Sequence, residues 1–251
     1  MQENPQEQQS SQYSQDIEHK NDNSAHISDK YRGLIPFDPS TAPVITKAVT
    51  VSFRTDAGDL TIEVYPEAAP NASKRFLELV EKGFYNDTPI FRVVKQPMPF
   101  VAQFGINWRP GMADYKNKNF DDDPSLFQLL PGTLAFAKAG PNTSSTQVFI
   151  NYDDNSPLRA QGFTTFARIT EGYENSEKFK SVGDPGMGLD QERLWSDGES
   201  YLKSQQNKPN IIIKAVVVKK DSTDAPPQGS SQAPQDDASL GAKASDYNTG
   251  P

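Results

Sequence analysis

The sequence contains no cysteine, and its two histidines, His19 and His26, both lie within the first 30 residues. The absence of cysteine excludes disulfides, zinc sites with cysteine ligands and thiol nucleophiles, and it leaves the redox compartment undetermined. Because no histidine follows residue 26, a histidine-based triad or a histidine-ligated metal is excluded from the rest of the chain. We therefore expect neither a metal nor a cofactor.

Long apolar runs and a surplus of basic charge are also missing. No window approaches 18 apolar residues, and Met1 is followed by polar residues without a basic and apolar leader, so we expect no membrane span. As the chain stands this predicts a cytoplasmic protein, or a periplasmic or secreted one if a signal sequence was removed. The formal net charge is −8, and most of it belongs to residues 1–30 and 220–251. A nearly neutral central part predicts no nucleic-acid partner.

Composition divides the chain into four parts. Residues 1–33 and 220–251 are polar and poor in large apolar side chains, so we predict two disordered tails. Residues 34–46 combine several prolines with a few apolar anchors, which is typical of an irregular arm on a domain surface, with a plain linker as the alternative. Residues 47–219 are predicted to form one folded domain.

Apolar periodicity within that domain predicts mostly strands. Residues 48–53 and 60–65 alternate around a polar turn, which indicates a hairpin. Phe76, Leu79 and Val80 have helical spacing between Asn71 and a stop at Gly83. Further strands are predicted at residues 89–94, 97–105, 132–136, 147–150, 163–169 and 211–218, and further helices at residues 173–182 and 191–205.

Two polar segments resemble ligand-binding loops in composition, but we interpret both as ordinary loops. The run Asp121–Asp123 lacks the ligand spacing of a calcium loop, so we predict a solvated turn. Residues 183–188 are rich in glycine but lack the Lys-Ser/Thr pair of a phosphate-binding loop.

Two other segments carry polar residues that hydrophobic packing does not require. The first contains Phe91-Arg92 and then Phe100-x-x-Gln103-x-Gly105, and the second reads Ala139-Gly-Pro-Asn-Thr-x-x-Thr-Gln-x-Phe149-Ile150. A lone Gly-Pro-Asn would indicate only a turn. In this order and spacing, however, the two segments resemble the signature segments of the cyclophilin-type peptidyl-prolyl isomerases.

The resemblance implies a mainly β fold, a closed eight-stranded antiparallel β-barrel capped by two helices. It also implies a monomeric isomerase that accelerates rotation about X-Pro bonds in proline-containing polypeptides and so assists protein folding. One alternative is a proline-peptide binding module that has kept the groove and lost turnover. Another is a barrel that binds small ligands inside.

The resemblance assigns roles to individual residues. Arg92 matches the arginine that acts on the prolyl nitrogen, and Gln103 matches the glutamine that hydrogen-bonds the substrate backbone nearby. Taken alone, Arg92 would be a surface salt-bridge partner and Gln147 would serve loop amides. The expected substrate-binding residues are Phe100, Val101, Ala137, Lys138, Ala139, Gln147, Phe149, Leu158 and Phe163.

Three departures from the family pattern bear on substrate preference. Residues Lys95–Pro99 lengthen the connection between Arg92 and Gln103, which should reshape the groove rim. Pro157 takes the position of a tryptophan that helps the family bind cyclosporin, so we expect weak cyclosporin binding. Phe163 replaces a pocket histidine, and Gln191–Lys208 is an insertion relative to compact members.

Overall fold

The computed structural model describes residues 30–218. The predicted tails therefore lie outside the described residues, apart from the stretch 30–33. In that stretch Tyr31 is fully buried.

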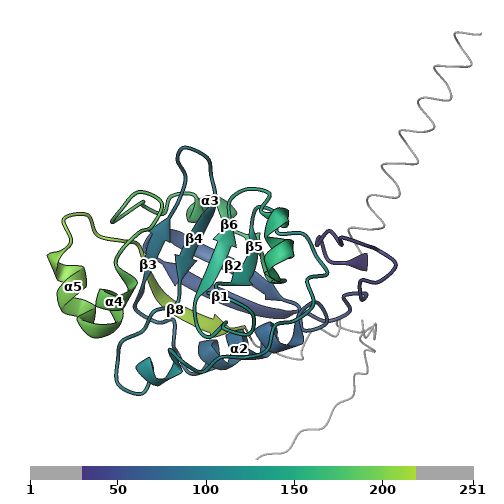
Figure 1. Ribbon diagram of the computed structural model, residues 1–251, viewed down its shortest axis with the longest axis horizontal. Coiled ribbons are helices and arrows are strands. Elements are labelled where there is room, and N and C mark those ends of the chain that lie inside the picture. The colour runs from purple at the N-terminus through teal and green to yellow at the C-terminus, as the bar shows by residue number, and fades with distance from the viewer. Residues whose placement is uncertain (1–29, 219–251) are drawn as a thin grey trace, which may run out of the picture. The chain divides into compact units, whose positions relative to one another are not determined.

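A closed barrel of eight strands forms the centre of the fold, as predicted (Figure 1). Its strands follow one another around the barrel in the order β1-β2-β7-β5-β6-β4-β3-β8, and every neighbouring pair is antiparallel. Their bounds are β1 (Val49–Thr55), β2 (Gly58–Val64), β3 (Thr88–Val93), β4 (Val101–Phe104), β5 (Thr133–Phe136), β6 (Val148–Asn151), β7 (Thr165–Glu171) and β8 (Ile211–Val217). Closure leaves the sheet without a free edge.

Burial along the strands separates two sides of the barrel. In β1 and β2, buried residues such as Val51 and Ile62 alternate with more exposed ones, as in a sheet with one solvent-exposed face. Strands β4, β5 and β6 are buried on both faces. Along β6, Val148 and Ile150 belong to the barrel core, whereas Phe149 belongs to a separate outer cluster. The outer faces of these strands are therefore covered by other parts of the chain.

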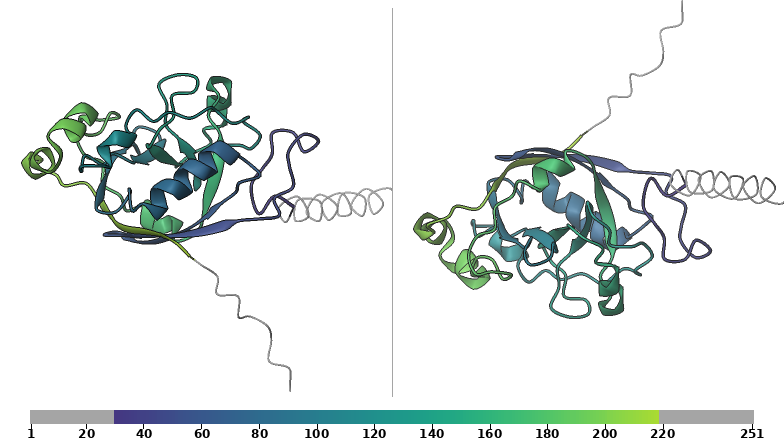
Figure 2. Two further views of the ribbon diagram at one scale, coloured as in Figure 1. Left: turned by 90° about the horizontal axis from the view of Figure 1, so that it is seen from below. Right: turned by 90° about the horizontal axis from the view of Figure 1, so that it is seen from above.

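One long helix, α2 (Pro70–Glu81), closes an end of the barrel (Figure 2). Its first residue is proline, which suits a position where the backbone N–H has no helical partner. Phe76 points into the core and stacks near Phe53 of β1, with ring centroids 5.9 Å apart. The apolar spacing had predicted this helix correctly.

The second predicted helix is much shorter than expected. Only Tyr173–Ser176 are helical (α3), so the prediction over residues 173–182 was wrong beyond the first turn. The carbonyl groups of Glu177 and Phe179 accept hydrogen bonds from the ammonium of Lys95. The N–H of Lys180 donates to the side chain of Asn210. These tertiary partners replace the helical hydrogen bonds.

The expected helix at 191–205 is divided into α4 (Gln191–Ser196) and α5 (Gly198–Ser204). Gly198 at the break has a φ of +52°, and a Cβ there would lie 2.3 Å from the indole of Trp108. Close contact with Trp108 thus requires glycine and interrupts the helix. The pair packs beside β3 through the buried residues Leu194 and Tyr201, which share a cluster with Phe91.

Residues 30–46 lie on the barrel at the far end of the long axis from α4 and α5 (Figures 1 and 2). Leu34 and Ile45 are buried against Tyr65 and Phe127. Backbone hydrogen bonds also join the segment to residues 126–128. These contacts hold the segment against the barrel.

Candidate functional site

A groove of about 340 Å³ crosses the outer face of strands β5, β6, β4 and β3. All the residues expected to bind or act on substrate line it, except Ala139 and Gln147. Three residues that the sequence did not predict also line it. The full lining is Arg92, Phe100, Val101, Gln103, Ala137, Lys138, Phe149, Leu158, Gln161, Phe163, Met187 and Gln191.

The floor of the groove is apolar. Val101 and Phe149 are buried in one cluster, against which Phe100, Leu158 and Phe163 are partly buried. The rings of Phe149 and Phe163 meet edge to face, with centroids 5.8 Å apart. Leu158 lies on the short 3₁₀ helix η2 (Ser156–Gln161), directly before Phe163. This floor offers an apolar surface to a ligand.

Arg92 is held at the edge of this floor by two neutral oxygen atoms. Its Nη1 donates to Oε1 of Gln103 at 3.1 Å, and its Nε donates to the backbone carbonyl of Gly186 at 2.7 Å. Its guanidinium lies 5.6 Å from the ring centre of Phe100. Burial lowers the pKa of Arg92 from its usual value, but a guanidinium remains charged at neutral pH.

Gln103 is oriented from both sides. It lies opposite Arg92 in the pairing of β3 with β4, and its Nε2 donates to Oε1 of Gln147 at 2.7 Å. Gln147 therefore contacts Gln103 and does not line the groove, and within residues 30–218 its side chain has no hydrogen bond to a loop amide. Together the two amides fix the direction of the Gln103 carbonyl toward Arg92.

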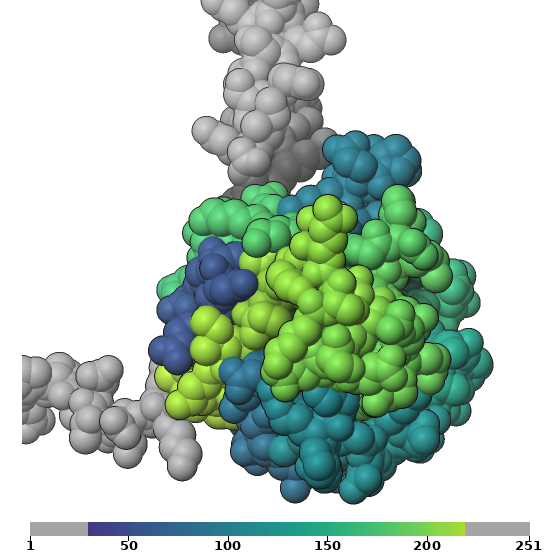
Figure 3. Space-filling view, turned by 90° about the vertical axis from the view of Figure 1, so that its left-hand side faces the viewer, coloured from purple at the N-terminus to yellow at the C-terminus, as the bar shows by residue number. Residues whose placement is uncertain are grey.

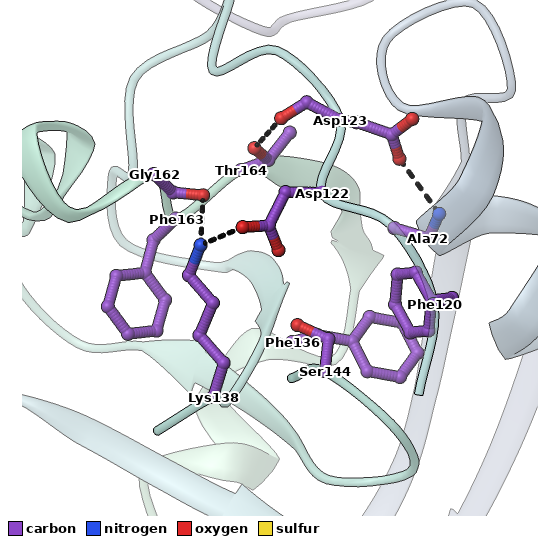
Figure 4. A pocket seen from close by; sticks show the side chains of 10 residues that line it. All are labelled: Ala72, Phe120, Asp122, Asp123, Phe136, Lys138, Ser144, Gly162, Phe163 and Thr164. Carbon is purple, nitrogen blue, oxygen red and sulfur yellow. Dashed lines mark hydrogen bonds and ion pairs between the residues drawn. The ribbon is translucent and has the colours of Figure 1, made fainter. Parts of the chain in front are cut away.

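Lys138 lines the groove, but its ammonium group is bound to other residues of the protein (Figure 4). Its side chain is only 3% exposed, and its ammonium lies 2.7 Å from Oδ2 of Asp122. It also donates to the carbonyl of Gly162 at 2.9 Å. Asp122 in turn accepts from the N–H of Asn142 at 3.0 Å. These bonds join the groove wall at Lys138 to the segment that carries Phe163.

Ala139 fails to line the groove for a local reason. Its N–H donates to the hydroxyl of Thr143 at 3.0 Å, inside the turn that follows. That turn includes Asn142 in the left-handed region, with a φ of +56°. The wall available to a ligand therefore ends at Ala137 and Lys138.

The acidic run 121–123 is not the solvated turn that the sequence predicted. Asp123 is buried and accepts from the N–H groups of Asn71 and Ala72, at the start of α2. Burial raises its pKa, and these two hydrogen bonds oppose that shift. Figure 4 shows Asp122 and Asp123 pointing to opposite partners, Lys138 and Ala72. Both acids are structural, and sequence spacing carried no sign of their distant partners.

The far end of the groove is built by the loop 183–190. Gly188 packs so closely on β3 that a Cβ would lie 2.4 Å from the carbonyl oxygen of Phe91 and 2.7 Å from the Cα of Arg92. Its φ of +78° also favours glycine. The N–H of Leu189 donates to Phe91 at 2.8 Å. This close contact brings Met187 and Gln191 to the groove.

The segment that was expected to reshape the rim of the groove is not part of the groove lining. None of residues Lys95–Pro99 lines the groove, although Phe100 directly after them does. The loop that contains them is closed at its base by hydrogen bonds between Val94, Phe100 and Val101.

Among the described residues, no group of three or more acidic or histidine side chains could hold a metal ion. No helix among them is long and apolar enough to cross a membrane.

Comparison with known proteins assigns the family. The model of the cyclophilin type peptidyl-prolyl cis-trans isomerase/CLD family matches residues 50–215. The chain belongs to the cyclophilin family. It is a peptidyl-prolyl cis-trans isomerase, which acts on proline-containing peptides.

Two relatives match over most of their own length. Peptidyl-prolyl cis-trans isomerase B of Escherichia coli is 31% identical over 178 residues, which are 67% of this chain and 98% of the relative. Peptidyl-prolyl cis-trans isomerase A of Dickeya dadantii is 28% identical over 192 residues, 74% of this chain and 93% of the relative.

A solved cyclophilin supports the same fold. The crystal structure of a cyclophilin type isomerase from Cryptosporidium parvum has a TM-score of 0.52 and 24% identity, and it covers 70% of this chain and 100% of that chain. A second structure of that protein, determined in the presence of the dipeptide Ala-Pro, has a TM-score of 0.50 at 24% identity.

Proposed function

We propose that this cyclophilin catalyses X-Pro rotation in the groove described above, with Arg92 as the catalytic residue. Rotation about a peptide bond has a barrier of about 18–20 kcal/mol because the nitrogen lone pair is delocalised into the carbonyl. In the twisted state that delocalisation is lost, and the prolyl nitrogen becomes basic. A fixed guanidinium N–H aimed at this nitrogen stabilises the twisted state more than the planar one.

The observation that carries the proposal is how Arg92 is held. Only its Nε and one Nη1 donor are used, toward Gly186 and Gln103. Its other N–H groups have no hydrogen-bond partner within residues 30–218, and no carboxylate there forms an ion pair with it. The side chain is thus positioned while its charge and donors remain available to a substrate.

The rest of the groove provides binding. The proline ring would lie on Phe100 and Phe149, and the residues before proline would pair with the backbone at Ala137 and Lys138. Gln103 would hydrogen-bond the substrate backbone next to the rotating bond. A rate enhancement of about 10⁴–10⁵ requires about 5.4–6.8 kcal/mol of differential stabilisation, which a charged hydrogen bond and orientation in a dry groove can supply.

The test is a protease-coupled isomerisation assay on an Ala-Pro tetrapeptide with wild type and Arg92→Ala. We expect the substitution to lower kcat/KM by about 10²-fold or more, as for other fixed transition-state donors, with the fold retained. Arg54→Ala on β1 is the matched control, because Arg54 is exposed and β1 pairs with β2 and β8 rather than with a groove strand. A wild type that binds proline peptides without accelerating rotation would instead favour the binding-module alternative.

We also propose that cyclosporin binds weakly and that the chain acts as a monomer. Pro157, the second residue of η2, takes the position of the family tryptophan, so a large ring is missing from this part of the rim. A monomer is the state that the resemblance to the family implies. Nanomolar cyclosporin affinity in calorimetry would contradict the first proposal, and a dimer in sedimentation analysis at assay concentrations the second.

A further inference from the structure

The groove has a direction set by strand order. From one end to the other it crosses β5, β6, β4 and β3, which are neighbours in the barrel. Lys138 follows β5 and marks one end, named here the β5 end. Arg92 lies on β3, and the loop 183–190 is hydrogen-bonded to that strand through Leu189. Met187 and Gln191 therefore mark the opposite end, named the β3 end.

The direction of the substrate follows from the proposed function, on which this inference rests. Residues before proline pair with the wall at Ala137 and Lys138, at the β5 end. The proline ring occupies the floor, and Arg92 faces the rotating bond. The residue that follows proline must then continue toward the β3 end, where Met187 is the large apolar side chain in reach of the groove.

Met187 is largely exposed, at 67%. Its turn is nevertheless well fixed, because Asp184 and Gly188 exchange two backbone hydrogen bonds of 2.9 Å and the N–H of Met187 donates to Asp184 at 3.1 Å. The observation is its place at the groove rather than its exposure, because Met187 is among the residues that line the groove. The flexible thioether of methionine adapts to varied partners.

Space continues beyond Met187. A second hollow of about 550 Å³ shares Met187 and Gln191 with the groove and extends over α4 and α5 to Tyr201 and Gln205. Figure 3 shows this helical face, in yellow-green, open to solvent below the projecting loop between β3 and β4. A polypeptide leaving the groove is therefore not blocked at the β3 end.

We propose that Met187 is a specificity-determining residue, which contacts the side chain that follows the substrate proline and selects large apolar side chains there. A glycine at that position leaves the methionine in water, whereas leucine or phenylalanine buries apolar surface against it. Because the contact is made beside the rotating bond, we expect it to appear in kcat/KM.

Exchange NMR on the peptides Ala-Ala-Pro-X-Ala, with X as phenylalanine, leucine or glycine, tests the proposal. We expect wild type to favour phenylalanine and leucine over glycine by about fivefold, and Met187→Ala to reduce this ratio below about twofold, as for a lost apolar contact. Met98→Ala is the matched control, since Met98 is 71% exposed and does not line the groove. It should keep the wild-type ratio.

Each other outcome counts against the assignment. An unchanged ratio in Met187→Ala, or a flat ratio in wild type that still isomerises all three peptides, overturns the proposal while leaving the enzyme intact. Loss of the ratio in Met98→Ala would move the contact to the β3–β4 loop and also overturn it. If wild type accelerates none of the peptides, the proposed site fails, and the specificity proposal fails with it.

Discussion

Two cationic side chains line the groove of this cyclophilin, and they are held in opposite ways. Arg92, at the β3 end, is bonded to the carbonyl of Gly186 and the amide of Gln103, which are both neutral. Lys138, at the β5 end, is bonded to the carboxylate of Asp122 at 2.7 Å. The first cation keeps its net charge toward the groove, and the second is neutralised by its partner.

The contrast separates two uses of positive charge. Neutral dipoles can fix a guanidinium in place without cancelling its field, so it can act on charge that develops in a substrate. A carboxylate at contact distance cancels most of the field of the ammonium and leaves a structural crosslink. We therefore expect substitutions that disturb Arg92 at the β3 end to lower kcat, and substitutions that disturb Lys138 at the β5 end to raise KM.

Of the two ends of the groove, the larger effect should come from the β3 end, with Gly188→Ala. The added Cβ would lie 2.4 Å from the carbonyl oxygen of Phe91, so the loop must move away from β3 and take the carbonyl of Gly186 with it. Arg92 then loses one of its two anchors. We expect kcat to fall by about 10²-fold, the size associated with a misplacement of about 1 Å. KM should change little, because the apolar floor is untouched.

Gly111→Ala is the control for backbone strain. Gly111 has a φ of +81°, close to that of Gly188, but a Cβ there would meet nothing within 4 Å. Both variants carry the cost of a left-handed alanine, roughly 1–2 kcal/mol, and only Gly188→Ala disturbs Arg92. Equal kinetics in the two variants would show that the loop does not position the arginine.

The sequence predicted the two ends of the groove unequally. The β5 end, most of the floor and Arg92 come from the segments 89–105 and 132–150, whose fixed residues resemble the family signature and lie on neighbouring strands. The rest of the β3 end comes from residues 183–191, which are distant in sequence from Arg92. Gly188 is needed there because of a contact with Phe91 and Arg92. A glycine in a loop does not reveal its partner, so Met187 and Gln191 were missed.

The fold was predicted wherever local pattern and tertiary environment agree. Alternation gave the strands, and the spacing of Phe76, Leu79 and Val80 gave α2. The failures arose where a distant side chain decides the local structure. Lys95 takes the carbonyls that would have extended α3, and α2 buries Asp123, which composition alone placed in solvent.

The smaller effect, at the β5 end, should come from Lys138→Met. The variant leaves the carboxylate of Asp122 without its cation in a partly buried site, and we expect the free energy of unfolding to fall by about 2 kcal/mol, less than for a fully buried pair. The link to Gly162 is also lost, so the wall and Phe163 are less well fixed. Binding weaker by about 1 kcal/mol would raise KM about fivefold. Kcat should be kept, because Arg92 is untouched.

A cycle with Asp122→Asn distinguishes a structural crosslink from a catalytic charge. If the pair is a crosslink, the double variant should lose less stability than the sum of the two single variants, since each single change leaves one charge without its partner. Both single variants should also raise KM in parallel. A fall in kcat with unchanged KM in Lys138→Met would mean that the ammonium acts on the substrate despite Asp122. The contrast with Arg92 would then be wrong, because the charge of the ammonium would still act on the substrate although the carboxylate of Asp122 is in contact with it.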